Sequence, residues 1–596
     1  MASSRSWQTA SSVLLCGAYV FVQALGGKVP PALPLCALSW VSVVLALSLP
    51  AGAAALKAGN YIAVAASTWH IWLAAIWIRE LFANRAFINA LWLTGAIGSL
   101  SLSIGLRLRS TKAPAFVQHK HWPYIAALAY ALVFGLQSQL RYLSYYNTWL
   151  DFGYMVHPIW NATQGRLLEM ALLEGGFGSS LGDHFSLIFL LIVPLMKVIP
   201  FAATLYFVQS AAVATGGIIF YYTCKDILHS PIQALLMQAS LYLWFPLQYG
   251  IISDFHADPL AVPFVFGMIW AFHKNRWSFW YACLIMAILC KEHIGLVIAP
   301  FIFIMAVQKR HMRIPLLATS VLSAVSTFVI QIHLIPLFNN GTETQAIANS
   351  FPGGEAGLTG VLATMLTRPE LIAERVFTIH NYEQLTWLFA PLLLIPLASW
   401  KMYVATSVMM VKELYGTFHI YNHHQAILSP MLFWSILEIL RRNDIAARKT
   451  LVIALVTSNA LFGLANGESP LSHRFWRAGP ERYFIPERAR LLDEAVKMIP
   501  DRASVSSLGH TAIHLFKRRE LYLYPHPFPR KMPEFVIFDM RYKEDGYQLV
   551  NKTFKNRPIE EMRNRFLRLR DSGKYETIFS RDGIYVLKKL RALSET

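Results

Sequence analysis

The sequence predicts a mainly α-helical protein, a polytopic membrane bundle followed by a separate C-terminal α/β domain. Of its 596 residues, 55% are hydrophobic and only 15% are charged, whereas soluble domains are about 45 to 50% apolar and about 25% charged. Apolar segments long enough to span a bilayer follow one another from residue 11 to residue 465, after which the composition becomes charged and mixed. An ordinary soluble enzyme is therefore excluded.

The apolar segments predict the individual spans. A transmembrane helix needs about 17 to 25 mostly apolar residues, so we expect about 13 to 15 such helices, with the shortest segments re-entrant. The predicted spans are residues 11–26, 31–50, 60–78, 86–106, 123–140, 202–223, 231–250, 258–273, 277–290, 294–308, 314–337, 384–400, 402–413, 424–440 and 449–465.

The chain is strongly basic, with 53 Lys and Arg against 34 Asp and Glu and a formal net charge of +19. In a soluble protein this excess would indicate a nucleic-acid partner. In a membrane protein, Lys and Arg collect in cytoplasmic loops instead, so we expect membrane lipids and no nucleic acid as partners. The five cysteines lie in or beside apolar segments without a CxxC pair, which favours buried thiols over disulfides or zinc ligands.

Clusters of basic residues predict the orientation. Four of them, at residues 107–120, 274–276, 309–313 and 441–449, fall on one side of the predicted spans. Placing that side in the cytoplasm puts the N-terminus inside, and most acidic residues before residue 465 outside. The outer face is therefore expected to carry the chemistry.

Three regions are predicted along the chain. Residues 1–120 form additional N-terminal transmembrane helices, residues 121–465 form a transmembrane core with outer loops at 141–201 and 338–383, and residues 466–596 form the extracytoplasmic α/β domain. The first outer loop contains an apolar segment, 185–200, that is short and interrupted by Pro194 and Pro200. We expect it to be a re-entrant or interfacial helix.

Six polar motifs on the predicted outer face carry a family resemblance. They are LDFG (150–153), IWNATQG (159–165), GDHFS (182–186), DFHADP (254–259), CKEHIGL (290–296) and HHQAILSP (423–430). In this order they resemble the GT-C superfamily of integral membrane glycosyltransferases, and more closely an uncharacterised prokaryotic family of predicted membrane proteins within it. The resemblance covers residues 123 to 540 and leaves the first helices outside.

The resemblance implies a GT-C-type bundle in the bacterial inner membrane. Members of the superfamily move a sugar from a polyprenyl-phosphate donor to a glycan, lipid or protein acceptor on the outer face. The aspartate that opens their first outer loop commonly acts as a general base or as a metal-associated acid, a role that falls on Asp151 here. A divalent metal such as Mg or Mn is thus implied, although no D-x-D sequence is present at this position.

The residues themselves indicate the same chemistry. Transfer to a hydroxyl group requires a carboxylate that accepts its proton, and Asp151 is the first candidate; the alternative is that Asp151 caps a loop helix. Asp254 and His256 are expected to form a functional pair that acts as a second acid or as donor-orienting groups. Asp258 precedes Pro259, and this order is typical of a structural helix N-cap.

A departing lipid phosphate needs cationic donors. The candidates are Lys291, His293, His423, His424, Arg141 and Arg166, together with Asp183, His184 and Glu292 as neighbouring substrate-binding groups. Two structural alternatives stay open: Asp183 could cap a helix that starts near Phe185, and the Lys291 and Glu292 pair could be an interfacial anchor. Asp254, His256, His293 and His423 could also hold a divalent ion, although their spacing is not diagnostic.

Two other functions compete with the transferase. One is a transporter or flippase of a lipid-linked or small solute, and the other is a catalytically inactive GT-C-like binding subunit. The transferase hypothesis predicts that the following residues converge beneath the first outer loop: Asp151, His184, Asp254, Lys291 and His423.

Overall fold

A computed structural model of the protein describes residues 85–111, 119–147, 149–171, 176–252, 254–339, 351–354, 357–416, 419–477, 479–542 and 559–590. Among these residues, four helices are long and apolar enough to cross a membrane, namely Ala86–Leu108, Ala202–Leu228, Arg310–Phe338 and Ile445–Asn466. Three shorter apolar helices are Phe189–Val198, Trp277–Ile288 and Ile294–Gln308. The predicted spans at 11–26, 31–50 and 60–78 lie outside the described residues, and the total number of spans stays a prediction.

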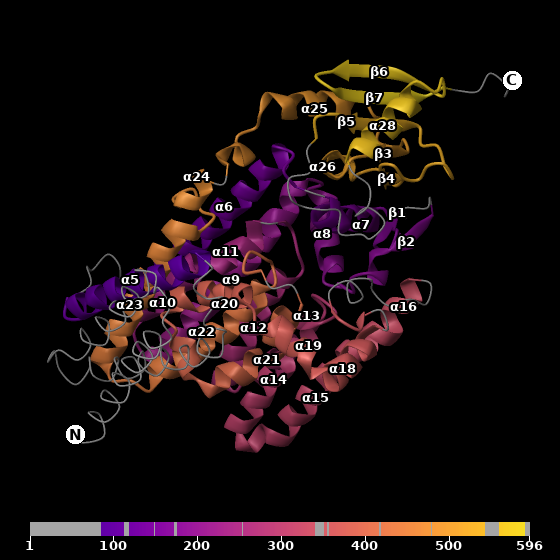
Figure 1. Ribbon diagram of the computed structural model, residues 1–596. Helices are drawn as coiled ribbons and strands as arrows, with labels where there is room; N and C mark the ends of the chain where they lie inside the picture. Colours follow the sequence, from indigo (N-terminus) through magenta and orange to yellow (C-terminus); the bar gives the residue numbers. More distant parts are fainter. Residues whose placement is uncertain are drawn as a thin grey trace, which may run out of the picture.

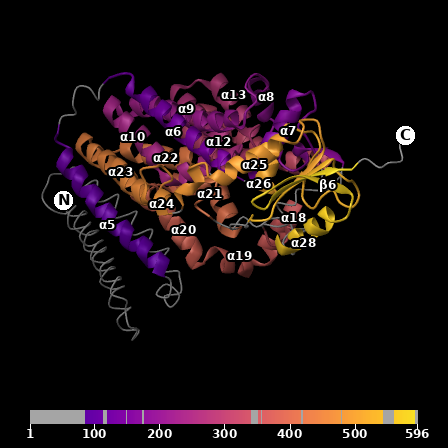
Figure 2. The same cartoon turned by 90° about the horizontal axis from the view of Figure 1, so that it is seen from above.

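The predicted class, a mainly helical bundle with a C-terminal α/β domain, is confirmed (Figure 1). The bundle contains α5 (Arg85–Leu108), α6 (Trp122–Leu143), α9 (Ala202–Leu228), α10 (Pro231–Leu243), α11 (Phe245–Ile252), α12 (Asp258–Lys274), α13 (Trp277–Ile288), α14 (Ile294–Gln308), η4 (Arg310–Met312), α15 (Arg313–Val329), η5 (Ile330–Leu334), α16 (Ile335–Phe338), α20 (Ile379–Phe389), α21 (Trp400–Tyr415), α22 (Gln425–Arg441) and α23 (Ile445–Asn466). In Figure 2, α5 lies along one side of the bundle beside α23, and the C-terminal sheet lies at the opposite end.

Prolines interrupt two of the predicted spans. The segment 231–250 divides at Trp244 into α10 and α11, with Pro246 in the first turn of α11. The continuous helix predicted over 384–400 is wrong, because α20 ends at Phe389 and two short 3₁₀ turns follow, η7 (Ala390–Leu392) and η8 (Ile395–Ala398). Each of these turns contains a proline, which lacks the N–H group that a continuing helix needs.

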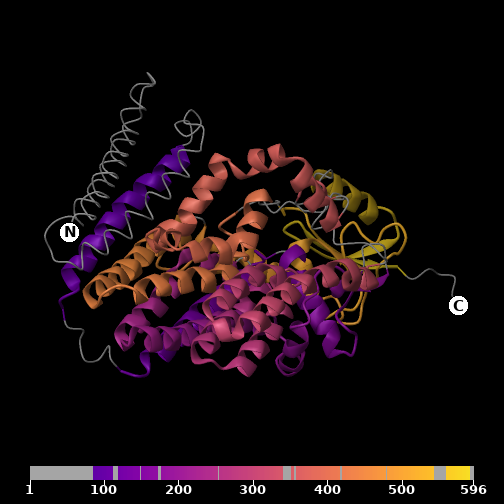
Figure 3. The same ribbon diagram turned by 90° about the horizontal axis from the view of Figure 1, so that it is seen from below.

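Two segments that are predicted to lie on the outer face, here called the first and second outer segments, lie between the bundle helices. The first contains η2 (Trp149–Gly153), α7 (Tyr154–Thr163), β1 (Glu169–Ala171), β2 (Phe177–Ser179), η3 (Ser180–Gly182) and α8 (Phe189–Val198). With 10 residues, α8 is about 15 Å long, too short to span a bilayer. The second contains α18 (Gly357–Thr367) and α19 (Pro369–Val376), and Figure 3 shows this salmon-coloured segment arching over one face of the bundle together with α20.

The C-terminal domain is built on a five-stranded sheet. Its elements are α24 (His473–Arg477), η9 (Pro480–Tyr483), α25 (Glu487–Lys497), β3 (Val505–Ser507), α26 (Gly509–Ala512), η10 (Ile513–Leu515), β4 (Leu521–Leu523), β5 (Phe535–Asp539), α28 (Ile559–Arg570), β6 (Tyr575–Arg581) and β7 (Ile584–Lys589). The strand order is β4-β3-β5-β7-β6, with β3 parallel to β4 and β5, and β7 antiparallel to β5 and β6. Figure 1 shows this yellow sheet beside α7, β1 and β2 of the first outer segment.

Candidate functional site

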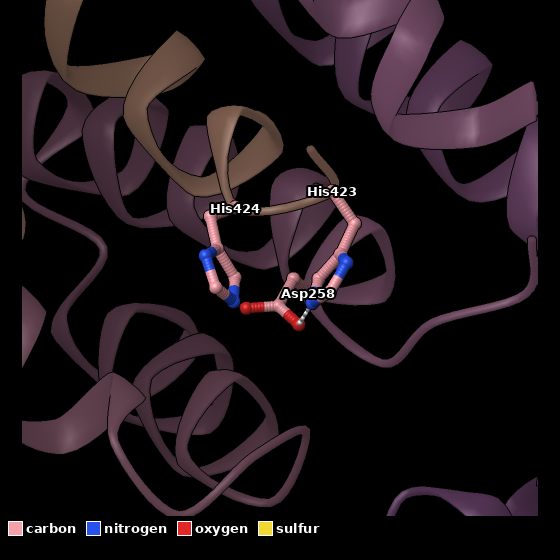
Figure 4. Close-up of side chains that lie close together, drawn as sticks. All are labelled: Asp258, His423 and His424. Atoms are coloured by element: carbon pink, nitrogen blue, oxygen red, sulfur yellow. Dashed lines mark ion pairs between the residues drawn. The ribbon is translucent and has the colours of Figure 1, made fainter. Parts of the chain in front are cut away.

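A buried carboxylate, Asp258, lies at the centre of a cluster of ionisable side chains. It stands at the start of α12 and has no exposed surface. Its Oδ2 accepts a hydrogen bond from Lys291 Nζ at 3.0 Å and lies 3.5 Å from His423 Nε2, while its Oδ1 lies 3.2 Å from His293 Nε2. Figure 4 shows the rings of His423 and His424 on either side of the Asp258 carboxylate. We call Asp258, Lys291, His293, His423 and His424 the polar cluster.

Three helices begin at the polar cluster. Asp258 is the first residue of α12, His293 directly precedes α14, and His424 directly precedes α22. The unpaired N–H groups at the start of a helix and its macrodipole attract negative charge. Together with the lysine and histidines, these three N-termini make the cluster suited to an anionic ligand.

The structural role predicted for Asp258 is wrong. The residue at the cap position of α12 is Ala257, and no side-chain hydrogen bond caps the helix. An aspartate before a proline is compatible both with a cap and with a first helical residue, so the sequence pattern does not distinguish the two. Asp258 instead provides the negative charge for Lys291.

Asp254 and His256 border the polar cluster and are held by α9. The Gln209 side chain donates a hydrogen bond to the Asp254 carbonyl at 2.9 Å and accepts one from the His256 N–H at 2.6 Å. The Asp254 carboxylate accepts a hydrogen bond from the Asn147 amide, which ties it to the first outer segment. The His256 ring stacks on the His423 ring, with 3.6 Å between centroids.

A second ion pair joins the first outer segment to the cluster. His184 Nδ1 lies 3.2 Å from Glu292 Oε1, and the Phe185 N–H donates to Glu292 Oε2 at 3.2 Å. Burial by itself would raise the pKa of Glu292, but the charge of His184 and its hydrogen bond lower the pKa to about 2. Asp183 does not cap a helix near Phe185, because α8 begins only at Phe189.

Lys412 and Glu413 of α21 complete the site, and the sequence reasoning missed both. His424 Nδ1 lies 2.9 Å from Glu413 Oε1, and Lys412 Nζ lies 3.6 Å from the same oxygen. The buried Lys412 Nζ has no hydrogen-bond partner among the described residues. The two residues end a predicted span, where a charged pair is typical of the membrane interface, so no signal distinguished them.

Asp151 lies in η2, within electrostatic range of Arg141, Lys291 and His184. Burial raises the pKa of the Asp151 carboxyl, and these three positive charges oppose the rise. The alternative that Asp151 caps a loop helix is wrong, because Gly153 precedes α7 and no side chain caps it. The Asp151 carboxyl therefore does not act as the cap of α7.

The two predicted arginines have different surroundings. Arg141 donates hydrogen bonds to the carbonyls of Ile252 at 2.9 Å and Tyr146 at 3.4 Å, so it ties the end of α6 to the end of α11. Arg166 instead donates to Asn161 Oδ1 at 2.7 Å and lies 3.5 Å from Glu169 Oε1. These contacts link α7 to β1 and do not involve the polar cluster.

The donors present do not match the expected Mg or Mn. The ligand atoms of Asp258, His423 and His424 lie within 4.8 Å of one another. Two of the three are imidazole nitrogens, whereas Mg and Mn favour oxygen ligands. The Lys291 ammonium already contacts Asp258 at 3.0 Å and His423 at 3.4 Å, so a positive charge occupies the position beside these ligands.

Comparison with known proteins agrees with the architecture of a membrane protein. Residues 141–586 match the family described as "Predicted membrane protein (DUF2079)", and the chain belongs to this family. The predicted uncharacterised membrane family is thereby confirmed.

A similar solved structure is the crystal structure of ArnT from Cupriavidus metallidurans bound to undecaprenyl phosphate. The similarity has 10% sequence identity and a TM-score of 0.41, and it covers 80% of this chain and 99% of that chain. A search of curated proteins finds no match.

Proposed function

We propose that the protein is a GT-C-type glycosyltransferase that moves a sugar from a polyprenyl-phosphate donor to a hydroxyl acceptor on the outer face of the membrane. The observation that carries the proposal is the half-buried carboxylate of Asp151, which lies within electrostatic range of the cationic groups Lys291 and His184. A general base adjacent to an anion site is what transfer from a phosphate leaving group requires.

The polar cluster is suited to the donor phosphate. Lys291, His184 and the half-buried Lys412 supply positive charge, and α12, α14 and α22 begin at the polar cluster. As the bond between the anomeric carbon and the phosphate oxygen breaks, negative charge grows on that oxygen. Fixed cations in a region shielded from water stabilise this charge strongly.

Asp151 is suited to activate the acceptor. Its carboxylate accepts the proton of the acceptor hydroxyl as that oxygen forms the new bond to the anomeric carbon. The products are the glycosylated acceptor and the polyprenyl phosphate, and Asp151 keeps one proton until water removes it. Because burial raises the pKa of Asp151, the carboxylate is a stronger base than an exposed aspartate.

The test is transfer of labelled sugar from polyprenyl-phosphate donors by the purified protein. Asp151→Asn keeps the size of the side chain but removes the base, and we expect turnover to fall about 100-fold or more. The control is Asp226→Asn, which removes an acid that is paired with Lys274 and lies outside the cluster. Equal turnover by wild type and Asp151→Asn contradicts the role of Asp151, and no turnover with any donor favours a transporter or a binding subunit.

A further inference from the structure

We infer that the C-terminal domain is part of the transferase site and that its residue His514 positions the segment that carries Asp151. The assignment of the domain to the transferase site and the kinetic readout rest on the proposed function, whereas the positioning of the segment by His514 does not. Three groups of contacts support the inference. The first joins the His514 ring to the aromatic side chains around η2, the second holds Tyr145 between α6 and η2, and the third holds the chain that follows η2.

The first group places His514 between two tyrosines of the bundle. Its ring stacks on Tyr145 with 3.7 Å between centroids and on Tyr142 with 4.1 Å. Tyr142 in turn packs edge-on against Phe152, the residue after Asp151, and Phe152 stacks on Tyr206 of α9. An unbroken series of ring contacts therefore runs from His514 to the neighbour of Asp151.

The second group holds Tyr145 in an unusual backbone conformation. Its φ of 62° lies in the left-handed region, which residues with a side chain rarely adopt. Its hydroxyl donates a hydrogen bond to Asp493 of α25 at 2.8 Å. Strained conformations persist only where their surroundings hold them, and here the C-terminal domain supplies both the hydrogen bond and the ring stack.

The third group fixes the chain on the other side of η2. The His157 ring donates a hydrogen bond from Nε2 to the carbonyl of Arg518 at 2.8 Å. The Trp160 ring N–H donates one to the carbonyl of Lys517 at 3.0 Å. Glu169 pairs with Arg519 through two contacts of 2.8 and 3.0 Å. Since the domain holds the chain both before and after η2, the location of Asp151 depends on the domain.

The His514 ring acts here through packing and not through charge. Burial, with the neighbouring His510, lowers the pKa of His514 to about 3, so the ring is neutral at physiological pH. A phenylalanine at this position therefore preserves the stack on Tyr142 and Tyr145, whereas alanine removes it. A comparison of the two variants therefore distinguishes the positioning of η2 by the ring stack from a general effect of the substitution on folding.

The experiment compares His514→Ala, His514→Phe and a control, Arg570→Ala on α28, in the full-length protein. We expect His514→Ala to lower kcat for sugar transfer about 10- to 100-fold, with the KM for the donor unchanged. His514→Phe should keep most of the wild-type kcat. Hydrogen exchange of residues 145–160, measured by mass spectrometry, should be faster in His514→Ala only.

Two results overturn the inference. One is hydrogen exchange of residues 145–160 at the same rate in His514→Ala as in the wild type. The other is an equal loss of kcat in His514→Ala and His514→Phe. If the wild type transfers no sugar from any donor, the proposed function fails, and the exchange measurement still decides whether the domain positions this segment.

Discussion

At the scale of single residues, Asp258 supplies the negative charge that pairs with Lys291 at the centre of the site. It contacts Lys291, His293 and His423 and is fully buried. Burial of an unpaired charge is unfavourable, and loss of one partner leaves the other uncompensated. The polar cluster is therefore balanced only while Asp258 is present.

Replacement of Asp258 tests this balance. We expect Asp258→Asn to lower the free energy of unfolding by about 3 to 5 kcal/mol, because Lys291 then lacks its buried counter-charge. The double variant Asp258→Asn with Lys291→Met should recover much of the loss, as measured by thermal unfolding in detergent. A double variant that is less stable than Asp258→Asn alone contradicts the assignment.

The His184 and Glu292 pair predicts a dependence on pH. Burial alone would lower the pKa of His184, but the charges of Asp183 and Glu292 raise it above its ordinary value of 6.5. The stabilisation from His184 is thus complete below pH 6.5 and is lost as the pH rises through the raised pKa. The stabilisation from Glu292 is complete above its ordinary value of 4.5 and is lost as the pH falls through about 2.

The pair should therefore stabilise the protein fully between pH 4.5 and pH 6.5. We expect Glu292→Gln to lower the Tm more at about pH 5.5 than at about pH 9, since the wild type has already lost part of the interaction at the higher pH. Thermal unfolding of both proteins at the two pH values measures this difference. The same Tm difference at both values would show that the pair does not titrate as described.

At the scale of elements, η2 depends on the small size of Gly153. A Cβ atom at this position would lie 2.4 Å from a ring carbon of Trp149, closer than atoms can approach. The indole of Trp149 is almost fully buried, so it cannot move aside easily. A glycine two residues after the candidate base therefore allows the turn that presents Asp151.

Gly153→Ala should displace Trp149 and with it η2. We expect a loss of about 1 to 3 kcal/mol in the free energy of unfolding, as for overpacked cores, and a fall in sugar transfer. The matched control is Gly98→Ala in α5, where the new Cβ meets only Leu393 at 4.0 Å; it should be neutral or up to about 1 kcal/mol more stable. Full activity in Gly153→Ala would contradict the claim that the geometry of η2 is needed to present Asp151 for sugar transfer.

The sequence predicted elements and site residues unequally well. Charged groups within an apolar chain are costly, so Asp151, His184, Lys291 and His423 were recognisable as candidates, and the structure brings them to one region. The breaks at Pro391 and Pro396 were missed because a long apolar segment outweighed the prolines. The sequence predicts that Arg166 binds the phosphate, because a pattern of residues does not show which partners an arginine has. In the folded chain its partners are Asn161 and Glu169.

At the scale of the whole molecule, the site joins segments that are distant in the sequence. The bundle contributes the starts of α12, α14 and α22, the first outer segment contributes Asp151 and His184, and the C-terminal domain holds that segment through His514. Such long-range assembly explains why the motifs were visible in the sequence while their contacts were not. It also implies that removal of the C-terminal domain would disorganise the site and not merely shorten the chain.

The most direct test of the account is an experimental structure of the protein with bound polyprenyl phosphate. We expect the phosphate to lie within hydrogen-bond distance of Lys291 or Lys412, at the N-termini of α12, α14 and α22, and Asp151 to face the position that the sugar would occupy. A phosphate bound elsewhere on the protein, with Lys291 still paired to Asp258 and Asp151 remote from the lipid, would contradict it.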